Sequence, residues 1–336
     1  MKNACIVGFG AIGPIHAKAI AETKDAKLYA ICDVIKERAK KGAEQYGAKV
    51  YTDFDTMLSD KEIDVVHICT PHYLHVPMAT ACLSAGKNVV LEKPVVMKPE
   101  EFEILANAVG NSPNKLCTML QNRTNPCVRR LRKEMQEKDL GDLKAVCAFL
   151  TWTRDEAYYR SEEWRGKWDT EGGGVLINQA VHLIDLMSWL GGGVEQLRCN
   201  ISTKYLDDII EVEDTADAVF YMKNGTRGCF YATNAYSENS PFRLELQFEK
   251  ALYRYADGLL YCIRDGQVEI LENDEKPTTG GKNYWGTGHL EVIRDFYQSL
   301  ETGTENYLCL KDAWHSAKVL MGMYTSAKQN GKMIQI

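Results

Sequence analysis

The sequence of 336 residues predicts two domains, an α/β domain with a parallel sheet and a following α+β domain whose strands are mostly antiparallel. Up to about residue 121, short β-branched runs alternate with helical segments, as they do in βαβ units. Past residue 140, tight turns divide stretches that alternate apolar and polar residues, which is typical of antiparallel strands. We therefore expect domains at residues 1–121 and 122–336.

The strands of the first domain follow one another at short, regular intervals. They are ACIVG (4–8), KLYAICD (27–33), KVY (49–51), VVHICT (65–70) and NVVLEKP (88–94). Helices are expected through residues 16–22 and 36–46 and in the later gaps. This order favours a parallel sheet with helices on both faces.

The second domain contains longer alternating runs. They are KAVCAFLTWT (144–153), TADAVFYMKN (215–224), GTRGCFYATN (225–234) and RLELQFEKALYRY (243–255). The turns at residues 223–225 and 264–266 end in Asn-Gly and Asp-Gly, which favour hairpins. Helices at 290–300 and 311–329 are expected to close the chain.

The composition excludes several classes of protein. A formal net charge of −6 gives no basic surface for nucleic acid, and no run of about 18 apolar residues predicts a membrane span. Glycines interrupt the apolar start MKNACIVGFG, so no signal peptide is expected. The 11 cysteines form no CxxC pair and often lie in apolar runs, which indicates reduced, buried thiols. We expect a cytoplasmic protein.

The motif GFGAIG at residues 8–13 follows the first strand and opens a helix. In this context the glycines allow a tight turn and close approach to a pyrophosphate, whose charge is stabilised at the helix N-terminus. Asp33 ends the second strand, where its carboxylate can accept both ribose hydroxyls and repel a 2′-phosphate. NAD is therefore favoured over NADP, although Lys36 and Arg38 lie close enough to weaken that preference. The alternative is a glycine-rich turn without a ligand.

Two further strands end in residues capable of chemistry. One ends in Thr70, Pro71, His72 and, three residues on, His75; the other ends in Glu92-Lys93-Pro94. A lysine beside a positive nicotinamide and partly out of water has a lowered pKa, which suits a proton carrier. The plainer alternatives are a surface lysine and satisfied loop histidines. The His72–His75 pair lacks the glutamate and helix of a zinc protease motif, so no metal site is predicted.

The segment GGGVLINQAVHLIDLMSWLGG (172–192) reads as one apolar helix. Asn178, His182 and Asp185 fall at i, i+4 and i+7 on one face, and Asp185 is the only charged residue. A solvated face carries more charges, so this stripe is expected to be at least half buried. Either these polar groups satisfy one another, or they serve a site.

Residues 152–168 are rich in aromatic and arginine side chains: Trp152, Arg154, Tyr158, Tyr159, Trp164, Arg165 and Trp168. Aromatic faces pack on the C–H faces of sugars while Arg and Tyr bind hydroxyls, so the segment suits a carbohydrate lid; core packing is the alternative. NYWGTGH (283–289) is a second glycine-flanked loop that could reach the same site.

Five motifs occur in this order: GFGAIG, TPHYLH, AGKNVVLEKP, QNRTNP and GGG…NQAVH…D. By these motifs the sequence resembles the Gfo/Idh/MocA family of NAD(P)-dependent oxidoreductases. The resemblance implies a Rossmann domain with a doubly wound parallel sheet, followed by a largely antiparallel sheet that holds substrate against the nicotinamide. It also implies that Lys93 and His182 flank the carbon that gives up hydride.

The sequence departs from the commonest family pattern at two positions, with His72 in place of Asn and Asn178 in place of a frequent Asp. The Asn form resembles a subgroup that acts on sugar ring hydroxyls, including 3-dehydrogenases of glycosides and nucleotide-linked sugars. Because asparagine cannot take a proton, Asn178 is expected to orient a hydroxyl. Asp185 either orients the His182 imidazole or is bonded elsewhere.

The expected site residues fall into two sets. The cofactor set is Gly8, Gly10, Ala11, Ile12, Gly13, Asp33, Thr70, Pro71, His72, His75, Glu92, Lys93, Gln121 and Asn122. The substrate set is Asn178, Arg123, Arg154, Tyr159, Trp164, Arg165 and His289.

Three functions remain open at this point: a sugar or cyclitol dehydrogenase, a redox-neutral glycoside-cleaving enzyme that retains NAD, and a nucleotide-sensing regulator. The dehydrogenase is favoured. The presence of Lys93 and His182 and the absence of a basic tail argue against the regulator. The resemblance also implies a homodimer or homotetramer.

Overall fold

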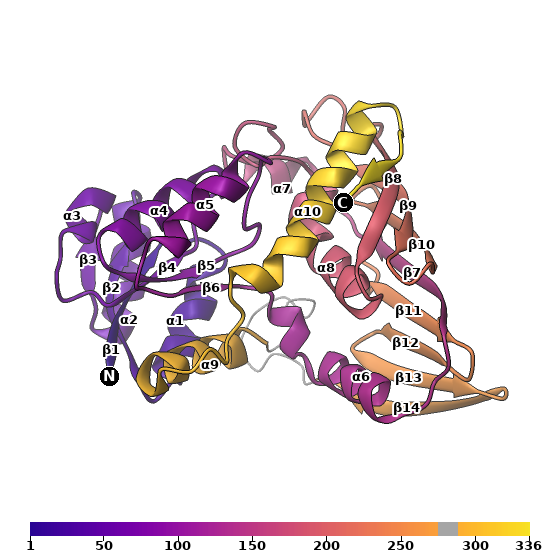
Figure 1. Cartoon of the computed structure of the whole chain (residues 1–336). Coiled ribbons are helices and arrows are strands. Elements are labelled where there is room, and N and C mark those ends of the chain that lie inside the picture. Colours follow the sequence, from indigo (N-terminus) through magenta and orange to yellow (C-terminus); the bar gives the residue numbers. More distant parts are fainter. Residues whose placement is uncertain (275–287) are drawn as a thin grey trace. The chain divides into compact units, whose positions relative to one another are not determined.

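The computed structural model describes residues 1–274 and 288–336, which form two compact units (Figure 1). The first unit contains Met1–Gln121 and Gly288–Ala313, and the second contains Asn122–Thr287 and Trp314–Ile336. The sequence places residues 288–313 in the second domain, whereas they cluster with the first. The reason is packing: Val292, Ile293 and Phe296 share an apolar core with Ile20.

The sheet of the first unit is parallel throughout, in the order β3-β2-β1-β4-β5-β6. This is the doubly wound order of a Rossmann domain, so the predicted fold is confirmed. The strands are β1 (Lys2–Val7), β2 (Ala26–Cys32), β3 (Lys49–Tyr51), β4 (Val65–Ile68), β5 (Asn88–Leu91) and β6 (Leu116–Thr118). β4 is buried along its whole length, as expected of a central strand covered on both faces.

Helices of the first unit follow the predicted pattern. They are α1 (Gly13–Ala21), α2 (Lys36–Tyr46), α3 (Phe54–Leu58), α4 (His75–Ser84), α5 (Glu101–Gly110) and α9 (Gly288–Thr302). A 3₁₀ turn, η1 (His72–Leu74), precedes α4, and another, η2 (Gln121–Thr124), follows β6.

The second unit is built on a nine-stranded sheet in the order β14-β13-β12-β11-β7-β10-β9-β8-β15. Its strands are β7 (Leu143–Thr151), β8 (Val194–Ser202), β9 (Thr215–Met222), β10 (Arg227–Thr233), β11 (Arg243–Phe248), β12 (Leu252–Ala256), β13 (Leu259–Arg264), β14 (Gln267–Asn273) and β15 (Ile334–Gln335). Among the described strands of this sheet only the β7–β10 pair is parallel, so the expectation of a mostly antiparallel sheet is confirmed. Buried and exposed residues alternate along β9 and β10, because one face of the sheet is covered.

The remaining described α-helices are α6 (Pro126–Glu137), α7 (Glu156–Arg160), α8 (Val181–Leu190) and α10 (Leu310–Lys328). α6 packs on β12, β13 and β14, and α8 packs on β7. No helix among the described residues is long and apolar enough to cross a bilayer. All 11 thiols are free; eight are buried, as predicted, but Cys147 and Cys309 are half-buried and Cys229 is exposed.

The prediction of one helix through 172–192 is wrong. A π-helical turn, η3 (Val175–Gln179), comes first, with Ala180 N–H bonded to Val175 carbonyl at 2.8 Å, and α8 begins only at Val181. The buried Glu213 carboxylate accepts the N–H groups of Gly174 and Leu176 at 2.9 and 3.0 Å and so directs the backbone away from a regular helix. Asn178 therefore belongs to a separate turn from His182 and Asp185. π-Helical turns are frequent at functional sites.

Candidate active site

The turn between β1 and α1 is shaped for a ligand at Gly10. A Cβ on Gly8, which has φ +89°, would lie 2.6 Å from the Cys69 carbonyl oxygen, and one on Gly13 would lie 2.7 Å from the Gly8 oxygen. These two glycines are required by the protein's own backbone. At Gly10 the only described atom near such a Cβ is Nη1 of Arg38, at 4.0 Å. Its backbone is therefore open to approach.

The start of α1 also suits an anion. The N-cap residue Ile12 has no polar side-chain atom that could cap the first turn, and a proline follows Gly13. The first N–H groups of a helix lack intrahelical partners and favour a negative charge. Ala11 and Ile12 lie in this turn, as predicted, and these observations fit the pyrophosphate of NAD.

Asp33 follows β2 and fixes the same turn. Its Oδ2 accepts the Phe9 N–H at 2.7 Å and its Oδ1 accepts the Ile35 N–H at 2.8 Å. Each carboxylate oxygen has two lone pairs, so both can still accept a ribose hydroxyl. Asp33 thus combines a structural contact with the predicted recognition of the ribose.

His75 joins the loops that follow β4 and β5. Its Nδ1 lies 2.8 Å from the Pro94 carbonyl and its Nε2 lies 3.0 Å from the Thr70 carbonyl, with the side chain almost fully buried. Burial lowers the pKa of His75, although both carbonyl contacts oppose this. Because a neutral imidazole carries one N–H, His75 donates to one of these two carbonyls. Its contacts with both loops fit the interpretation as a loop histidine. His72 is also buried, and direct contact of either histidine with the cofactor stays a prediction.

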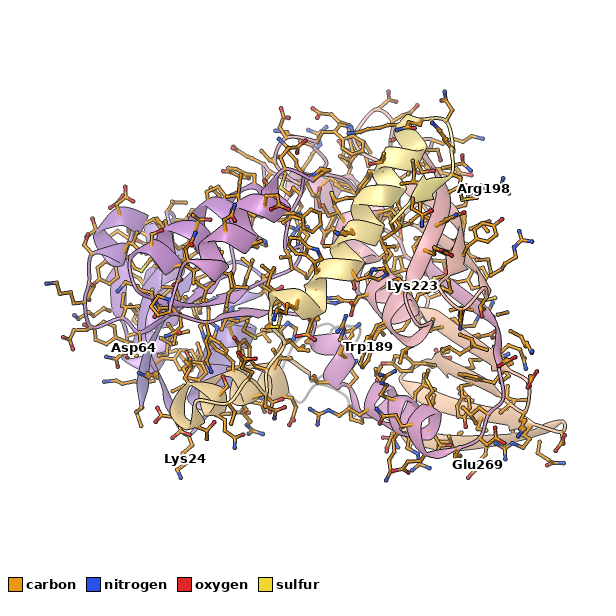
Figure 2. The ribbon with its side chains drawn as sticks, viewed as in Figure 1. Lys24, Asp64, Trp189, Arg198, Lys223 and Glu269 are labelled. Carbon is orange, nitrogen blue, oxygen red and sulfur yellow. The ribbon has the colours of Figure 1, made fainter. Side chains whose placement is uncertain are left out.

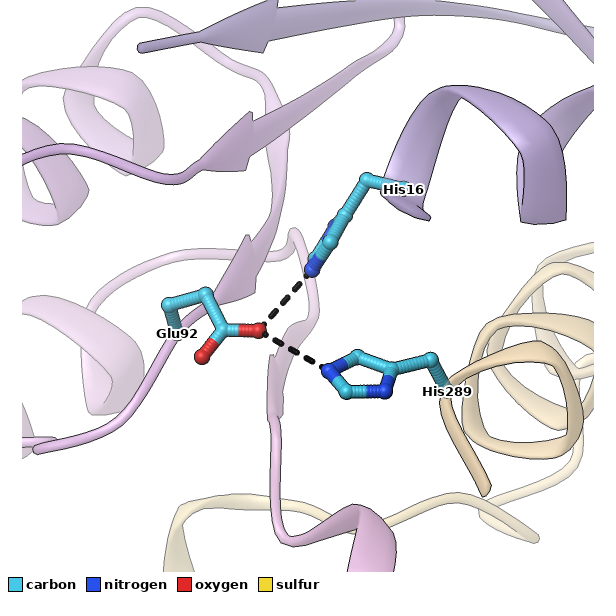
Figure 3. A group of neighbouring side chains, drawn as sticks. All are labelled: His16, Glu92 and His289. Carbon is cyan, nitrogen blue, oxygen red and sulfur yellow. Dashed lines mark hydrogen bonds and ion pairs between the residues drawn. The ribbon is translucent and has the colours of Figure 1, made fainter. Parts of the chain in front are cut away.

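Glu92, directly after β5, lies at the centre of a buried group of side chains (Figure 3). Its Oε1 lies 2.9 Å from Nε2 of His16 and 3.6 Å from Nε2 of His289, and its Oε2 accepts the N–H of Lys93 at 3.1 Å. Burial raises the pKa of Glu92, but the hydrogen bonds from His16 and His289 outweigh it and hold the pKa well below its usual value. Glu92 is therefore a buried carboxylate that anchors the backbone of Lys93.

Two more buried side chains extend this group, and the sequence reasoning missed both. Nδ1 of His16 lies 2.9 Å from Nδ1 of His67, whose Nε2 lies 3.0 Å from the hydroxyl of Tyr297. Burial holds the pKa of His67 well below its ordinary value, and burial also lowers that of His16 against the opposing effect of Glu92. The available signal was a single histidine within the apolar strand VVHI.

Ligand atoms of His16, Glu92 and His289 all lie within 4.8 Å of one another. This group could hold a metal ion, which the sequence reasoning did not foresee. His289 was predicted to contact substrate, but it lies at the start of α9 and faces Glu92 (Figure 3). The rest of its predicted loop, residues 284–287, lies outside the described residues.

In the second unit, Asn178 has a fixed amide orientation. Its Nδ2 donates to Oε1 of Glu171 and lies 3.4 Å from the Tyr158 hydroxyl. A carboxylate can only accept, so the amide nitrogen must face Glu171. The hydroxyl of Tyr158 also accepts from Gln179 at 3.1 Å and from Arg165, which links the aromatic segment to the Asn178 turn.

Asp185 is bonded elsewhere rather than to His182. Its two oxygens accept from Nε and Nη2 of Arg123 at 2.9 and 2.6 Å, and Ser316 donates to Oδ1 as well. Both side chains of the pair are at most 6% exposed, and the Arg123 guanidinium lies 4.7 Å over the ring of Trp189, labelled in Figure 2. Arg123 therefore has a structural partner, and its contact with substrate stays a prediction. His182 lies half-buried in the first turn of α8.

The aromatic segment serves partly as core and partly as surface. Tyr159 packs with Leu206, Ile210 and Val212, and its hydroxyl accepts from Asn234 at 3.0 Å. Trp152 is also buried and donates to the Ser240 carbonyl.

Arg154 is buried and donates to Asn239 at 2.8 Å. Trp164 and Arg165 are half-buried, and the Arg165 guanidinium lies 4.2 Å over the ring of Tyr158. Sugar binding by Arg154, Trp164 and Arg165 stays a prediction, whereas Tyr159 and Trp152 match the packing alternative. Gln121 and Asn122, predicted to contact the cofactor, are buried in η2.

The carboxylate of Glu213, which the sequence analysis did not single out, supports the turn that contains Asn178. Besides its two backbone contacts it accepts from the Tyr324 hydroxyl at 2.9 Å. Burial raises its pKa to about 7 against these hydrogen bonds. No sequence signal distinguished it from the acidic residues beside it.

Comparisons with known proteins identify the family of this chain. Residues 2–119 match the model of the oxidoreductase family with an NAD-binding Rossmann fold, and residues 128–254 match the GFO/IDH/MocA C-terminal domain. Myo-inositol 2-dehydrogenase of Thermotoga maritima is 23% identical over 308 residues, covering 89% of this chain and 88% of that protein. Levoglucosan dehydrogenase of Pseudarthrobacter phenanthrenivorans is 28% identical, covering 90% of each.

Solved structures give the same result. The WlbA dehydrogenase from Bordetella pertussis, in complex with NADH and UDP-GlcNAcA, is 27% identical, with a TM-score of 0.86 over 100% of this chain and 98% of that one. Together the two family models match well over half of the chain. The chain therefore belongs to the Gfo/Idh/MocA family of NAD-dependent oxidoreductases.

Proposed function

We propose that this protein is an NAD-dependent dehydrogenase that oxidises a secondary hydroxyl of a sugar, glycoside or cyclitol. One observation carries the assignment to this chain's own residues: His16, on the helix that begins at the cofactor turn, is bonded to Glu92, which anchors Lys93. The lysine is thus tied to the element that binds the pyrophosphate. In open α/β sheets, ligands bind beyond the carboxyl ends of the strands, where Lys93 lies.

The division of labour follows from the chemistry of the groups. NAD accepts the hydride when it is bound. Lys93 takes the hydroxyl proton, and His182 assists as the second proton-transferring group. Asn178 cannot take a proton, so it holds a neighbouring hydroxyl, in an orientation set by Glu171.

The preference for NAD over NADP rests on Asp33. Its carboxylate is nine-tenths buried and already holds two backbone N–H groups, so it cannot turn away from a 2′-phosphate. Repulsion between the two anions disfavours NADP.

The substrate class follows from the relatives and from Asn178. Two of the proteins compared above are named as dehydrogenases of myo-inositol and levoglucosan, and the WlbA dehydrogenase is in complex with UDP-GlcNAcA. All three compounds contain a ring with hydroxyl groups. The Asn form of the motif supports oxidation at C3 of a pyranose. Half-buried Trp164 and Arg165 supply the apolar face and the donor that a sugar ring needs.

We further propose a homodimer or homotetramer in the reducing cytoplasm. The edge strand β14 exposes Val268 and Ile270, at 63% and 56%, and exposed apolar edges are commonly covered by another chain. The free thiols favour a reducing compartment. Light scattering of the purified protein measures the oligomer size directly.

The experiment that tests the activity is NADH absorbance after mixing the protein and NAD with free hexoses, inositols, β-glucosides and nucleotide sugars. Lys93→Met is the test variant, and Lys98→Met, an exposed lysine of the same loop, is the matched control. A signal that only Lys93→Met abolishes supports the proposal. No signal, with NAD already bound and a glycoside cleaved, would support the redox-neutral alternative instead.

A further inference from the structure

Five buried polar side chains on four elements of the first unit form one continuous group. They are His67 on β4, His16 on α1, Glu92 after β5, and Tyr297 and His289 on α9, and each is at most 4% exposed. Contacts of 3.0, 2.9 and 2.9 Å lead from Tyr297 through His67 and His16 to Glu92. The proposed catalytic chemistry does not yet use His67 or Tyr297.

The negative charge of Glu92 determines the donor and the acceptor in each hydrogen bond of this series. A carboxylate accepts only, so Nε2 of His16 must carry its proton, and Nδ1 of the neutral ring must accept. Nδ1 of His67 then donates, its Nε2 accepts, and the Tyr297 hydroxyl donates to it. One buried anion thus sets the tautomers of two histidines.

We propose that this series of hydrogen bonds is a network that positions Lys93 for the catalytic step. Tyr297, His67 and His16 hold Glu92 as a carboxylate, and Glu92 fixes Lys93. The inference rests on the proposed role of Lys93 as proton carrier. Two contacts support it: Glu92 Oε2 binds the Lys93 N–H, and Oε1 is bound to α1, which begins at the cofactor turn. A shift of the carboxylate would move the lysine relative to that turn.

Glu92 is surrounded by side chains that burial keeps uncharged. The other titratable groups around Glu92 are neutral at pH 7: His16, His67, His75 and Cys69 all have pKa values moved toward the neutral form, first by burial. His289 and Tyr297 complete the surroundings. Glu92 is therefore the negative charge among these groups.

A bound metal ion would require the opposite proton arrangement. If His16, Glu92 and His289 held a cation, Nε2 of His16 would be a ligand without a proton, and its Nδ1 would donate to His67. His67 would then donate from Nε2 to Tyr297. The tautomers of His16 and His67 therefore distinguish the two arrangements.

The first experiment is ¹⁵N NMR of the histidine rings in the full-length protein, with the signals assigned by His16→Gln and His67→Gln. We expect the Nε2–H tautomer for His16 and the Nδ1–H tautomer for His67. Glu92→Gln, which can donate, should allow both to reverse, whereas Tyr297→Phe should leave both unchanged. The opposite tautomers in the unsubstituted protein, or one tightly bound metal ion per chain, would overturn the proposal. This readout does not depend on activity.

The second experiment is steady-state kinetics, which separates kcat from KM. Glu92→Gln should lower kcat about 10- to 100-fold through misplacement of Lys93, with the KM for NAD within about 3-fold.

Glu92→Asp, which retains the charge, should keep the tautomers of both histidines at a reduced kcat. Tyr253→Phe, a fully buried tyrosine bonded to Glu134, is the matched control for Tyr297→Phe. An unchanged kcat in Glu92→Gln would contradict the network. If Lys93→Met is inactive and His16 and His67 keep the expected tautomers, both the proposed function and the network are supported. If Lys93→Met is fully active, the proposed function alone is refuted.

Discussion

Replacing Asp185 with Asn removes the counter-charge of Arg123 while keeping the side-chain volume. The pair is bidentate at 2.9 and 2.6 Å, with exposures of 6% for Arg123 and 1% for Asp185. Breaking a buried pair by removing one partner costs about 3–5 kcal/mol, because the other charge stays buried. We expect Asp185→Asn to lower the free energy of unfolding by about that amount.

The assay is urea unfolding followed by tryptophan fluorescence, to which Trp189 beside Arg123 contributes. Ser316→Ala is the milder control, since it removes one neutral donor to the same carboxylate at a cost of about 1 kcal/mol. A double variant with Arg123→Met and Asp185→Leu should recover most of the loss. If Asp185→Asn unfolds at the normal urea concentration but loses kcat more than about 100-fold, then Asp185 acts on His182 and the structural interpretation is refuted.

Three further predictions follow from single residues. Gly10→Ala should fold normally and weaken NAD binding in calorimetry, whereas Gly8→Ala should lose stability, because its Cβ would strike the Cys69 carbonyl at a left-handed φ; equal stability of the two variants would contradict this. Asp33→Ser should raise the affinity for NADP relative to NAD, measured by fluorescence titration, and an unchanged ratio would remove the assigned role of Asp33. Glu213 has a pKa raised to about 7, so the native state holds its proton more tightly than the unfolded chain does, and its contribution should reduce stability as the pH rises from about 4.5 to 7. Urea unfolding across this range should show that slope in the unsubstituted protein and lose it in Glu213→Gln.

Much of the fold was predictable because local patterns determine it. β-Branched runs separated by helices predict the parallel sheet, and GFGAIG after the first strand predicts the turn now seen between β1 and α1. The hairpin at Lys223-Asn224-Gly225 follows from a glycine that adopts φ +83°.

The missed features depend on contacts between residues far apart in the chain. The break before α8 is made by Glu213, nearly 40 residues beyond Gly174, so periodicity within the segment cannot show it. His16, Glu92 and Tyr297 likewise meet only through the fold. Asp185 has the spacing that suits a partner of His182, yet its partner is Arg123, 62 residues away.

The most direct test of the central claim is mass spectrometry of the cofactor after the protein and NAD are incubated with a ring-deuterated sugar or inositol that gives NADH. When the label is on the oxidised carbon, we expect NADH that is heavier by one deuterium. Lys93→Met should not form this product. Unlabelled cofactor beside a consumed substrate would contradict transfer of hydride from the ring to NAD.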